Sequence, residues 1–444
     1  MNKAVKFSED IYPIDLTEAP KLTVFTQRQL AKIPQFMALP DEARKGVEVA
    51  ALVFPFRVNE YVVNELIDWN DWENCAIFRL TFPQKAMLSE DDFKALEQAY
   101  DDGDKALMKE HIERIREGLN PHPAGQMELN VPTFNGEPVE GIQHKYRQTV
   151  LFFPTQGQTC HSYCTFCFRW AQFVGDKDLK FASKEVAQLV GYLSEHKEVT
   201  DILFTGGDPM VMKTKALKSY LEAMLEPELD HIKTIRIGTK ALTFWPYRFV
   251  TDDDADELIE LLQKCVDAGK HVAIMAHYNH WKELTTDISK VAIQRIRATG
   301  AEIRSQGPLL KGINDDPNVW AKMWQLQVSQ GIIPYYMFVE RDTGAHHYFE
   351  VKLEKAWNIY RDAQQQVSGV CRTARGPSMS ASPGKVEVQG VTEINGEKVF
   401  ALRFIQGRDA DWIQRPFFAK YNPDATWLDH LEPALGEEKF FFED

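Results

Sequence analysis

The chain has 444 residues, of which 44% are hydrophobic and 26% charged, and its formal net charge is −14. This acidic balance argues against a nucleic-acid partner, because such a surface needs clustered Lys and Arg. The length predicts two or three folding units that bury enough surface to be stable without disulfide bonds.

The first residues, MNKAVKFSEDIYPIDL, lack the apolar core of a signal peptide. No window of the sequence approaches the roughly 18 apolar residues that a membrane helix requires. We therefore expect a cytoplasmic protein without membrane contact. In a reducing compartment, clustered cysteines bind metal or do chemistry more often than they form disulfide bonds.

The first 140 residues have the pattern of helical segments joined by polar connectors. Residues 91–119 are the clearest helical pair, and a Pro-rich passage, NPHPAGQ (120–126), leads into the next region. We therefore assign residues 1–140 to an N-terminal helical region.

From about residue 149 to residue 340, short runs rich in β-branched and aromatic residues alternate with amphipathic stretches of helical period. Their nearly regular spacing is that of successive βα units in a parallel sheet. Six units predict an α/β fold, either a partial barrel or an open doubly wound sheet. In both, the chemistry gathers at the C-terminal strand ends. The expected strands are 149–154, 201–206, 234–239, 271–278, 301–306 and 333–338.

Beyond residue 345 we expect one more helix, over 351–369, followed by the Gly-, Pro- and Ser-containing stretch RGPSMSASPGKVEVQG (375–390). Short strands with Asn-Gly and Gly turns follow. We assign residues 346–444 to a C-terminal α+β region.

Three cysteines, Cys160, Cys164 and Cys167, follow the first of these strands in CHSYCTFCFRW (160–170). A structural zinc site wants four protein ligands, so His161 or His144 would have to complete one here, because the other cysteines are scattered singly. A four-iron cluster normally takes four thiolates, so three would leave one iron open to an external ligand.

The spacing C-x3-C-x2-C after the first strand of a βα array, with Phe166 before the last cysteine, resembles the signature of the radical S-adenosylmethionine (SAM) superfamily. The resemblance implies that the open iron of a [4Fe-4S] cluster binds SAM and that Phe166 packs near the adenine. The segment TGGDP (205–209) matches the family's glycine-rich segment, which assigns Gly206, Gly207 and Asp208 to SAM binding. Glycines there let the backbone approach a ligand closely.

Most of residues 140–390 resembles the lysine 2,3-aminomutase family. The matching segments are IQHKYRQTVLF, TDILFTGGDPMV, IRIGTKAL, AHYNHWKEL, RSQGPLLKGIND and PYYMF, in the family's order. The resemblance implies an isomerase whose residues 141–345 form a radical SAM partial (β/α)6 TIM-like barrel. It also implies that SAM, the cluster and pyridoxal 5′-phosphate (PLP) together move the α-amino group of an amino acid to the β-carbon. An electron donor such as flavodoxin or ferredoxin would be a partner.

The resemblance also assigns the PLP site. The family's PLP lysine lies in a loop of form P-G-G-G-G-K, which nominates Lys385 in SASPGKVEV, although only one Gly stands between Pro and Lys here. Of the family's two phosphate-binding arginines, Lys145 matches one and Thr149 stands at the other position, with Arg147 two residues earlier. The family's C-terminal zinc cysteines are missing, which argues against a zinc-stabilised, swapped oligomer, and a homo-oligomer of another kind stays an alternative.

Other assignments concern substrate and SAM. Arg169 lies where the family's substrate-carboxylate arginine lies, and its planar fork suits a bidentate contact. His277 and Gln306 match polar positions near SAM.

Two aspartates of the family hold the ammonium group of the substrate side chain. Asp315 matches one, and at the other place the chain has Arg341, with Asp342 one residue later. A carboxylate there favours lysine, ornithine or arginine, whereas an arginine favours an acidic substrate such as glutamate. L-Lysine is our leading prediction, and the other three are alternatives. Further alternatives are a radical SAM enzyme without PLP, which the shortened loop supports, and a zinc-binding barrel that serves as an interaction module.

Overall fold

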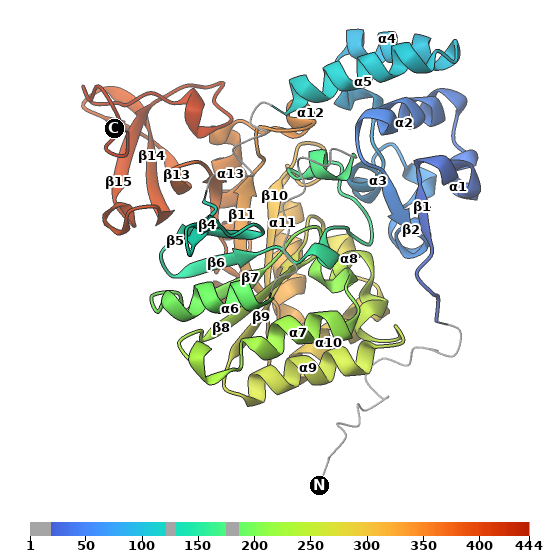
Figure 1. Cartoon of the computed structure of the whole chain (residues 1–444). Coiled ribbons are helices and arrows are strands. Elements are labelled where there is room, and N and C mark those ends of the chain that lie inside the picture. The colour runs from blue at the N-terminus through green and yellow to red at the C-terminus, as the bar shows by residue number, and fades with distance from the viewer. Residues whose placement is uncertain (1–18, 121–129, 175–185, 444) are drawn as a thin grey trace.

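The computed structural model describes residues 19–120, 130–174 and 186–443, so positions 121–126 of the Pro-rich passage lie outside it. Its α/β fold is built around a sheet of eleven strands (Figure 1). Six central strands are parallel and follow one another in chain order. They are β6 (Thr149–Phe152), β7 (Asp201–Phe204), β8 (Thr234–Thr239), β9 (His271–His277), β10 (Glu302–Leu309) and β11 (Ile333–Val339). These bounds match the expected strands closely, except that β10 runs further.

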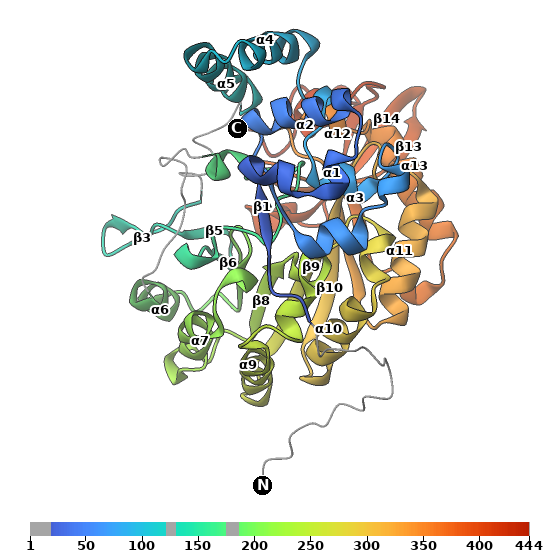
Figure 2. The same cartoon turned by 90° about the vertical axis from the view of Figure 1, so that its right-hand side faces the viewer.

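The helices that follow these strands form an arc along one side of the sheet (Figure 2). Successive right-handed crossovers in one direction place every helix on the same face. A doubly wound sheet would instead reverse its strand order and carry helices on both faces. No helix of the described residues is long and apolar enough to cross a bilayer. The helices are α6 (Val186–Glu195), α7 (Thr214–Ala223), α9 (Ala255–Asp267), α10 (Asp287–Ala298), α11 (Pro317–Ser329) and α13 (Leu353–Gln365), with the short α8 (Ala241–Phe244) and α12 (His346–Phe349).

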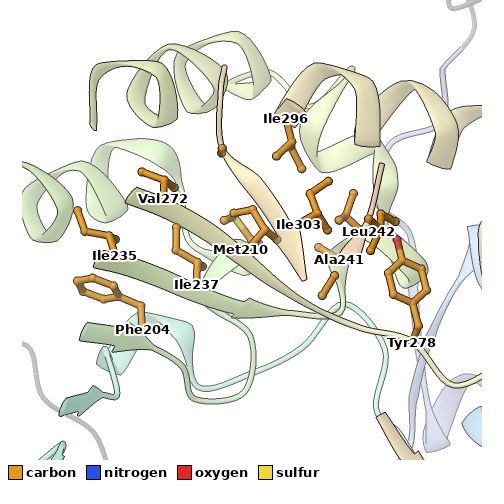
Figure 3. Packing of buried hydrophobic residues seen from close by; sticks show 14 of the residues in the cluster. Phe204, Met210, Ile235, Ile237, Ala241, Leu242, Val272, Tyr278, Ile296 and Ile303 are labelled. Atoms are coloured by element: carbon orange, nitrogen blue, oxygen red, sulfur yellow. The ribbon is translucent and has the colours of Figure 1, made fainter. Parts of the chain in front are cut away.

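Alternation along the strands separates an apolar face from a polar one. In β8, Ile235 and Ile237 are buried toward the helices, while Arg236 between them points to the other face. Figure 3 shows this apolar layer, with Ile296 of α10 near Ile303 of β10. On the opposite face, Arg236 Nε donates to Asp201 Oδ1 at 2.8 Å. The face without helices is therefore the one that carries polar groups.

The sheet is strongly curled. The edge strand β5 (Ile142–Tyr146) pairs antiparallel with β6, and seven strand-to-strand steps separate it from β12 (Arg375–Ser380). In a flat sheet these steps of about 4.8 Å would put the two strands about 34 Å apart. Yet Lys145 Nζ of β5 donates to the carbonyl of Ala381, one residue past β12, at 2.6 Å. Side chains, and no hydrogen-bonded ladder, thus close the seam between β5 and β12.

The N-terminal region lies to the upper right in Figure 1 and packs around an apolar core that also includes Phe166, Phe244 and Leu310 of the βα array. It is mostly helical, as expected, but also contains a two-stranded antiparallel sheet of β1 (Val24–Thr26) and β2 (Arg57–Asn59). Its helices are α1 (Pro34–Met37), α2 (Asp41–Val53), α3 (Ala76–Thr81), α4 (Glu90–Asp101) and α5 (Lys105–Leu119), and the small pair β3 (Thr133–Phe134) and β4 (Glu137–Pro138) follows.

The C-terminal region extends the sheet at its other end. After β12, which lies parallel to β11, the hairpin of β13 (Gly384–Ile394) and β14 (Glu397–Gly407) and then β15 (Pro416–Lys420) are antiparallel. Asn395 and Gly396, with φ of 52° and 83°, form the expected two-residue turn, which requires positive φ at both positions. The two hairpin strands have 11 residues each, longer than the short strands that we expected.

Candidate active site

The three predicted cluster cysteines lie in one loop, residues 153–169, directly after β6. Each is partly buried, and burial raises the pKa of each thiol, to about 11 for Cys167. Asp208 and the other two thiols raise the pKa of Cys160 further, so these groups are close neighbours. A thiolate at such a place needs a nearby positive charge, which a bound metal supplies.

A zinc site would need a fourth ligand beside the three thiols, and His161, whose buried Nδ1 has no hydrogen-bond partner among the described residues, lies in the same loop. Among residues 19–120, 130–174 and 186–443, no three or more His, Cys, Asp and Glu side chains are placed to hold a metal ion. His144 is engaged elsewhere, with Tyr192 Oη at 2.6 Å and the Arg147 carbonyl at 3.1 Å. Ligands of one zinc ion must converge on a point, whereas the thiolates of a four-iron cluster bind different irons. Thiol ligands suit zinc and iron–sulfur clusters alike, so the preference for a cluster rests on the number of thiols, which is three.

The two glycines after β7 press against the residues that precede Cys160. A Cβ on Gly207 would lie 2.5–2.7 Å from backbone atoms of Thr159, and one on Gly206 would lie 2.4 Å from Gln158 Nε2. Gly206 also has a φ of +150°, which disfavours other residues. We expected these glycines to admit a ligand. In the structure they admit the start of the cysteine loop, and their role toward SAM stays a prediction.

Asp208 is buried and serves as a structural acceptor at the same strand end. Its carboxylate accepts three hydrogen bonds: from Met210 N at 2.9 Å, from Thr239 Oγ1 at 2.7 Å and from Lys240 N at 2.9 Å. Burial raises its pKa to about 6 despite these bonds. The bonds join the end of β7 to the end of β8 beside the cysteine loop.

Three of the residues assigned to SAM are neighbours. Phe166 stacks on the His277 ring, with 5.7 Å between centroids and 25° between planes. Gln306 of β10 lies directly opposite His277 of β9. His277 Nε2 is buried and has no hydrogen-bond partner among the described residues, and burial holds the pKa of His277 well below its usual value. An aromatic face beside an unpaired polar nitrogen suits a flat heteroaromatic ligand such as adenine.

Arg169 ends the loop with neutral neighbours. Its guanidinium donates to Gln172 Oε1 at 2.8 Å and to Gln158 Oε1 at 3.4 Å, and it lies 4.4 Å from the Phe153 ring centroid. Burial lowers its pKa to about 10, so it remains a cation at neutral pH. A partly buried guanidinium held by amide oxygens can exchange them for a carboxylate, which it binds more strongly.

Lys385, nominated as the PLP lysine, lies on β13 in an aromatic pocket. Its Nζ lies 4.6 Å from the ring centroid of Tyr336 and 6.0 Å from that of Tyr146, and donates to Gln406 Oε1 at 2.8 Å. Burial, then Arg236 and Arg375, lower its pKa to about 7. At pH 7 the Lys385 amine is therefore neutral in about half of the molecules, and a desolvated lysine beside other cations is an activated nucleophile.

A group of cations surrounds Lys385. Lys145 Nζ lies 5.5 Å from the centroid of Tyr146, so the two lysines share a ring, and Arg375 shares the Tyr336 ring with Lys385 at 4.3 Å. Burial, Arg408 and Arg341 lower the pKa of Lys145 to about 7. Such crowding of like charges favours an anionic ligand.

Arg408 was missed by the sequence analysis, and Arg147 takes a different place from the one it suggested. Arg408 follows β14 and donates to the Ser382 carbonyl at 2.9 Å, next to the carbonyl that Lys145 contacts. Arg147 is exposed on the turn between β5 and β6. A cavity of about 560 Å³ opens beside Arg408, Ser382 and Pro383. No sequence motif marks Arg408, because its place depends on the hairpin pairing.

The residues expected to choose the substrate side chain are separated. Asp315 accepts from Gly312 N at 2.8 Å and pairs with Lys355 of α13 at 2.7 Å, and no described contact joins it to Lys385. Arg341 instead lies 5.0 Å from the ring centroid of Phe168, which belongs to the cysteine loop. The charge of Arg341 also lowers the pKa of Lys145. Asp342 raises the pKa of Arg341, which burial lowers more strongly.

Comparison with known proteins supplies the family. No family model matches the chain. It is 29% identical over 401 residues to a protein of Aquifex aeolicus named as an L-lysine 2,3-aminomutase, covering 90% of this chain and 94% of that relative. It is 30% identical to the L-lysine 2,3-aminomutase of Haemophilus influenzae, covering 56% of this chain and 70% of that relative. The match to the Methanococcus maripaludis L-lysine 2,3-aminomutase spans about half of that relative, 51%.

Solved structures add no support. A radical SAM methyltransferase from Sphaerobacter thermophilus overlaps 53% of this chain and 68% of its own, at 14% identity and a TM-score of 0.38. The family therefore rests on the sequence alignments. The chain belongs to the lysine 2,3-aminomutase family and is an isomerase of the aminomutase type.

Proposed function

We propose that this chain is a radical SAM, PLP-dependent 2,3-aminomutase that moves the α-amino group of an amino acid to its β-carbon. One observation carries the proposal: Arg341 and Lys145 link the cysteine loop to Lys385, a lysine whose pKa is lowered to about 7. Arg341 contacts Phe168 of that loop and also lies near Lys145, which faces the same ring as Lys385. We further propose that residues 141–345 are a radical SAM partial (β/α)6 barrel between regions 1–140 and 346–444.

Cys160, Cys164 and Cys167 would hold three irons of a [4Fe-4S] cluster, and the fourth would take SAM. The donor set of three thiols supports this, as does the unpaired His277 Nε2 beside Phe166. When bound, the cluster and SAM supply a carbon-centred radical, and PLP carries the amino group that migrates. An electron donor such as flavodoxin or ferredoxin would reduce the cluster.

Lys385 would hold PLP, and Lys145 would bind its phosphate. In place of Arg147, which is exposed, we propose that Arg408 and Arg375 complete the anion site, because Arg375 shares a ring with Lys385 and Arg408 bonds next to Lys145. The neutral amine of Lys385 can attach PLP covalently and release it again, while the aromatic rings exclude water. Arg169 would fix the substrate carboxylate as a planar fork.

L-Lysine, the substrate in the relatives' names, is our first candidate. One observation favours a second, an acidic amino acid such as glutamate: a cation, Arg341, lies among the site residues, and Asp315 is paired with Lys355. Since a partly buried cation repels a cationic side chain and attracts a carboxylate, these charges suit an anionic substrate end. Arginine and ornithine remain alternatives.

The test is anaerobic reconstitution with iron, sulfide, PLP and SAM, followed by assay of L-lysine, L-glutamate, L-arginine and L-ornithine with a chemical reductant. We expect iron and sulfide in the chain and a β-amino acid from one of the four. Zinc at one per chain without sulfide would refute the cluster, and no β-amino acid from any substrate would refute the aminomutase.

Borohydride tests the lysine separately. It should fix PLP on the wild type and not on Lys385→Ala. Equal fixation on both would refute the assignment of Lys385. No fixation on the wild type would instead favour a radical SAM enzyme without PLP, in line with the single Gly of the SASPGKVEV loop.

A further inference from the structure

Backbone carbonyls of β2 and α3, in the N-terminal region, accept hydrogen bonds from the cysteine loop, although they lie about a hundred residues before it in the sequence. Tyr163 N donates to the Arg57 carbonyl of β2 at 2.8 Å. Thr165 N donates to the Leu80 carbonyl of α3 at 2.9 Å, and Thr165 Oγ1 donates to the Arg79 carbonyl at 2.6 Å. These bonds fall between the cysteines, at positions 163 and 165.

Asn59, the last residue of β2, makes the most connections. Its side chain is fully buried, at 0% exposure, and its Nδ2 donates to the Phe244 carbonyl at 2.7 Å and to the His161 carbonyl at 3.4 Å. Its Oδ1 accepts from Val62 N at 3.0 Å, and its backbone N–H donates to Ser162 Oγ at 3.1 Å. One side chain thus ties the N-terminal region, the cysteine loop and the end of α8 together.

The cysteine loop needs such external partners because little regular structure supports it. Between β6 and Arg169, its regular structure is a single short 3-10 turn, Thr155–Gly157, before the cysteines. The glycines after β7 support residues 158 and 159, but that contact ends where the cysteines begin. Buried loop amides and carbonyls must find partners, and metal ligands keep their geometry only where neighbouring groups fix them.

We propose that Asn59 is a positioning residue for the three-cysteine loop, and that β2 and α3 form a support on which the stability of the bound cluster depends. The inference rests on the proposed cluster. It assigns a function to the N-terminal region, which lies outside the βα array that carries the cysteines.

The experiment compares reconstituted full-length variants. Asn59→Ala removes three side-chain bonds, and Thr165→Val removes one without a change of shape. Asn314→Ala is the matched control: it is also 0% exposed, and its amide makes three bonds, to Asn279 O at 2.9 Å, Pro308 O at 3.0 Å and Leu310 N at 2.7 Å. None of these partners belongs to the cysteine loop.

We would measure the rate at which a chelator removes iron, the electron paramagnetic resonance spectrum of the reduced cluster with and without SAM, and the thermal midpoint. Asn59→Ala and Thr165→Val should lose iron about tenfold faster than the wild type, the order of effect seen when groups that orient metal ligands are removed. Asn314→Ala should lower the thermal midpoint but lose iron at the wild-type rate.

Equal iron loss in Asn59→Ala, Thr165→Val and the wild type would overturn the inference alone. The inference would also be overturned if Asn314→Ala lost iron faster as well, so that the rate of iron loss in all variants simply followed the thermal midpoint. A wild type that binds no iron and sulfide would overturn the proposed function as well.

Discussion

The lowered pKa of Lys385 has a measurable consequence for its reactivity. Burial and the neighbouring Arg236, Arg375 and Lys145 bring its pKa from the usual 10.5 to about 7. At pH 7.5 about three quarters of such amines are neutral, against about 0.1% for a lysine with a pKa of ~10.4. The reactive fraction is therefore several hundredfold larger, and we expect Lys385 to react with amine-directed reagents near neutral pH.

The assay is brief labelling of the apoprotein with a neutral amine reagent from about pH 5 to about pH 10, with peptide mass spectrometry of each digest. Lys105, exposed on α5, provides a reference in the same digest. The labelling of Lys385, scaled to its own plateau, should rise with a midpoint near its pKa of about 7. A midpoint above about 9, close to that of ordinary lysines, would show that the pocket does not stabilise the neutral amine and would refute the reasoning.

Four further predictions follow from single contacts. In denaturant unfolding, Gly207→Ala should lower the free energy of unfolding by about 1–3 kcal/mol, because its Cβ would lie 2.5 Å from the Thr159 backbone, and it should also lower the iron content. The control Gly118→Ala, whose Cβ would have nothing within 4 Å, should leave the free energy of unfolding unchanged or raise it. In urea unfolding, Lys240→Met should lower the free energy of unfolding by about 3–5 kcal/mol, because it leaves the Glu283 carboxylate, which is 0% exposed, without its cationic partner at 2.7 Å. The control Lys94→Met, which removes an exposed ion pair with Glu90, should change the free energy of unfolding little. Arg169→Lys should lower kcat/KM about 100-fold while iron content is unchanged, because an ammonium cannot replace the fork; an unchanged kcat/KM would contradict the carboxylate role. Lys385→Met should raise the free energy of unfolding, and this gain should be largest below pH 7, where the wild-type protein must bury a charged Lys385 whose folded-state pKa is about 7. The gain should disappear as the pH rises through the unfolded-state pKa of ~10.4, above which the lysine is neutral in both states.

The alternating pattern was enough to place the sheet strands. Apolar residues at every second position of β8 are typical of a strand with one buried face, and the continuous apolar run in β9 is typical of a strand buried on both faces. The pairing of Lys385 with Gln406 could also be predicted from the sequence. A two-residue turn at Asn395 and Gly396 pairs Ile394 with Glu397, and counting outward along both strands puts Lys385 opposite Gln406. The two bulges between these points shift the register in opposite senses and cancel.

The contacts that close the site could not be predicted in the same way. Arg147 and Lys145 are two residues apart, yet the turn after β5 leaves Arg147 exposed while Lys145 reaches Ala381. That difference depends on how far the whole sheet curls, which no local pattern encodes. Asn59 was likewise invisible, because a buried asparagine in a short strand carries no signal until the loop that it contacts is folded onto it.

The seam between β5 and β12 bears on how the site is filled. Elsewhere between β6 and β12, neighbouring strands are joined by backbone ladders, and separating any of them would break several hydrogen bonds at once. At the seam, the Lys145 side chain reaches across to the Ala381 carbonyl, close to the cavity beside Ser382 and Arg408. Swinging that side chain aside costs one hydrogen bond and a rotamer change, about 1–2 kcal/mol. If Lys145 binds the PLP phosphate, as proposed, the entering anion would draw Lys145 away from Ala381, and the phosphate would enter and leave the finished fold without unfolding it.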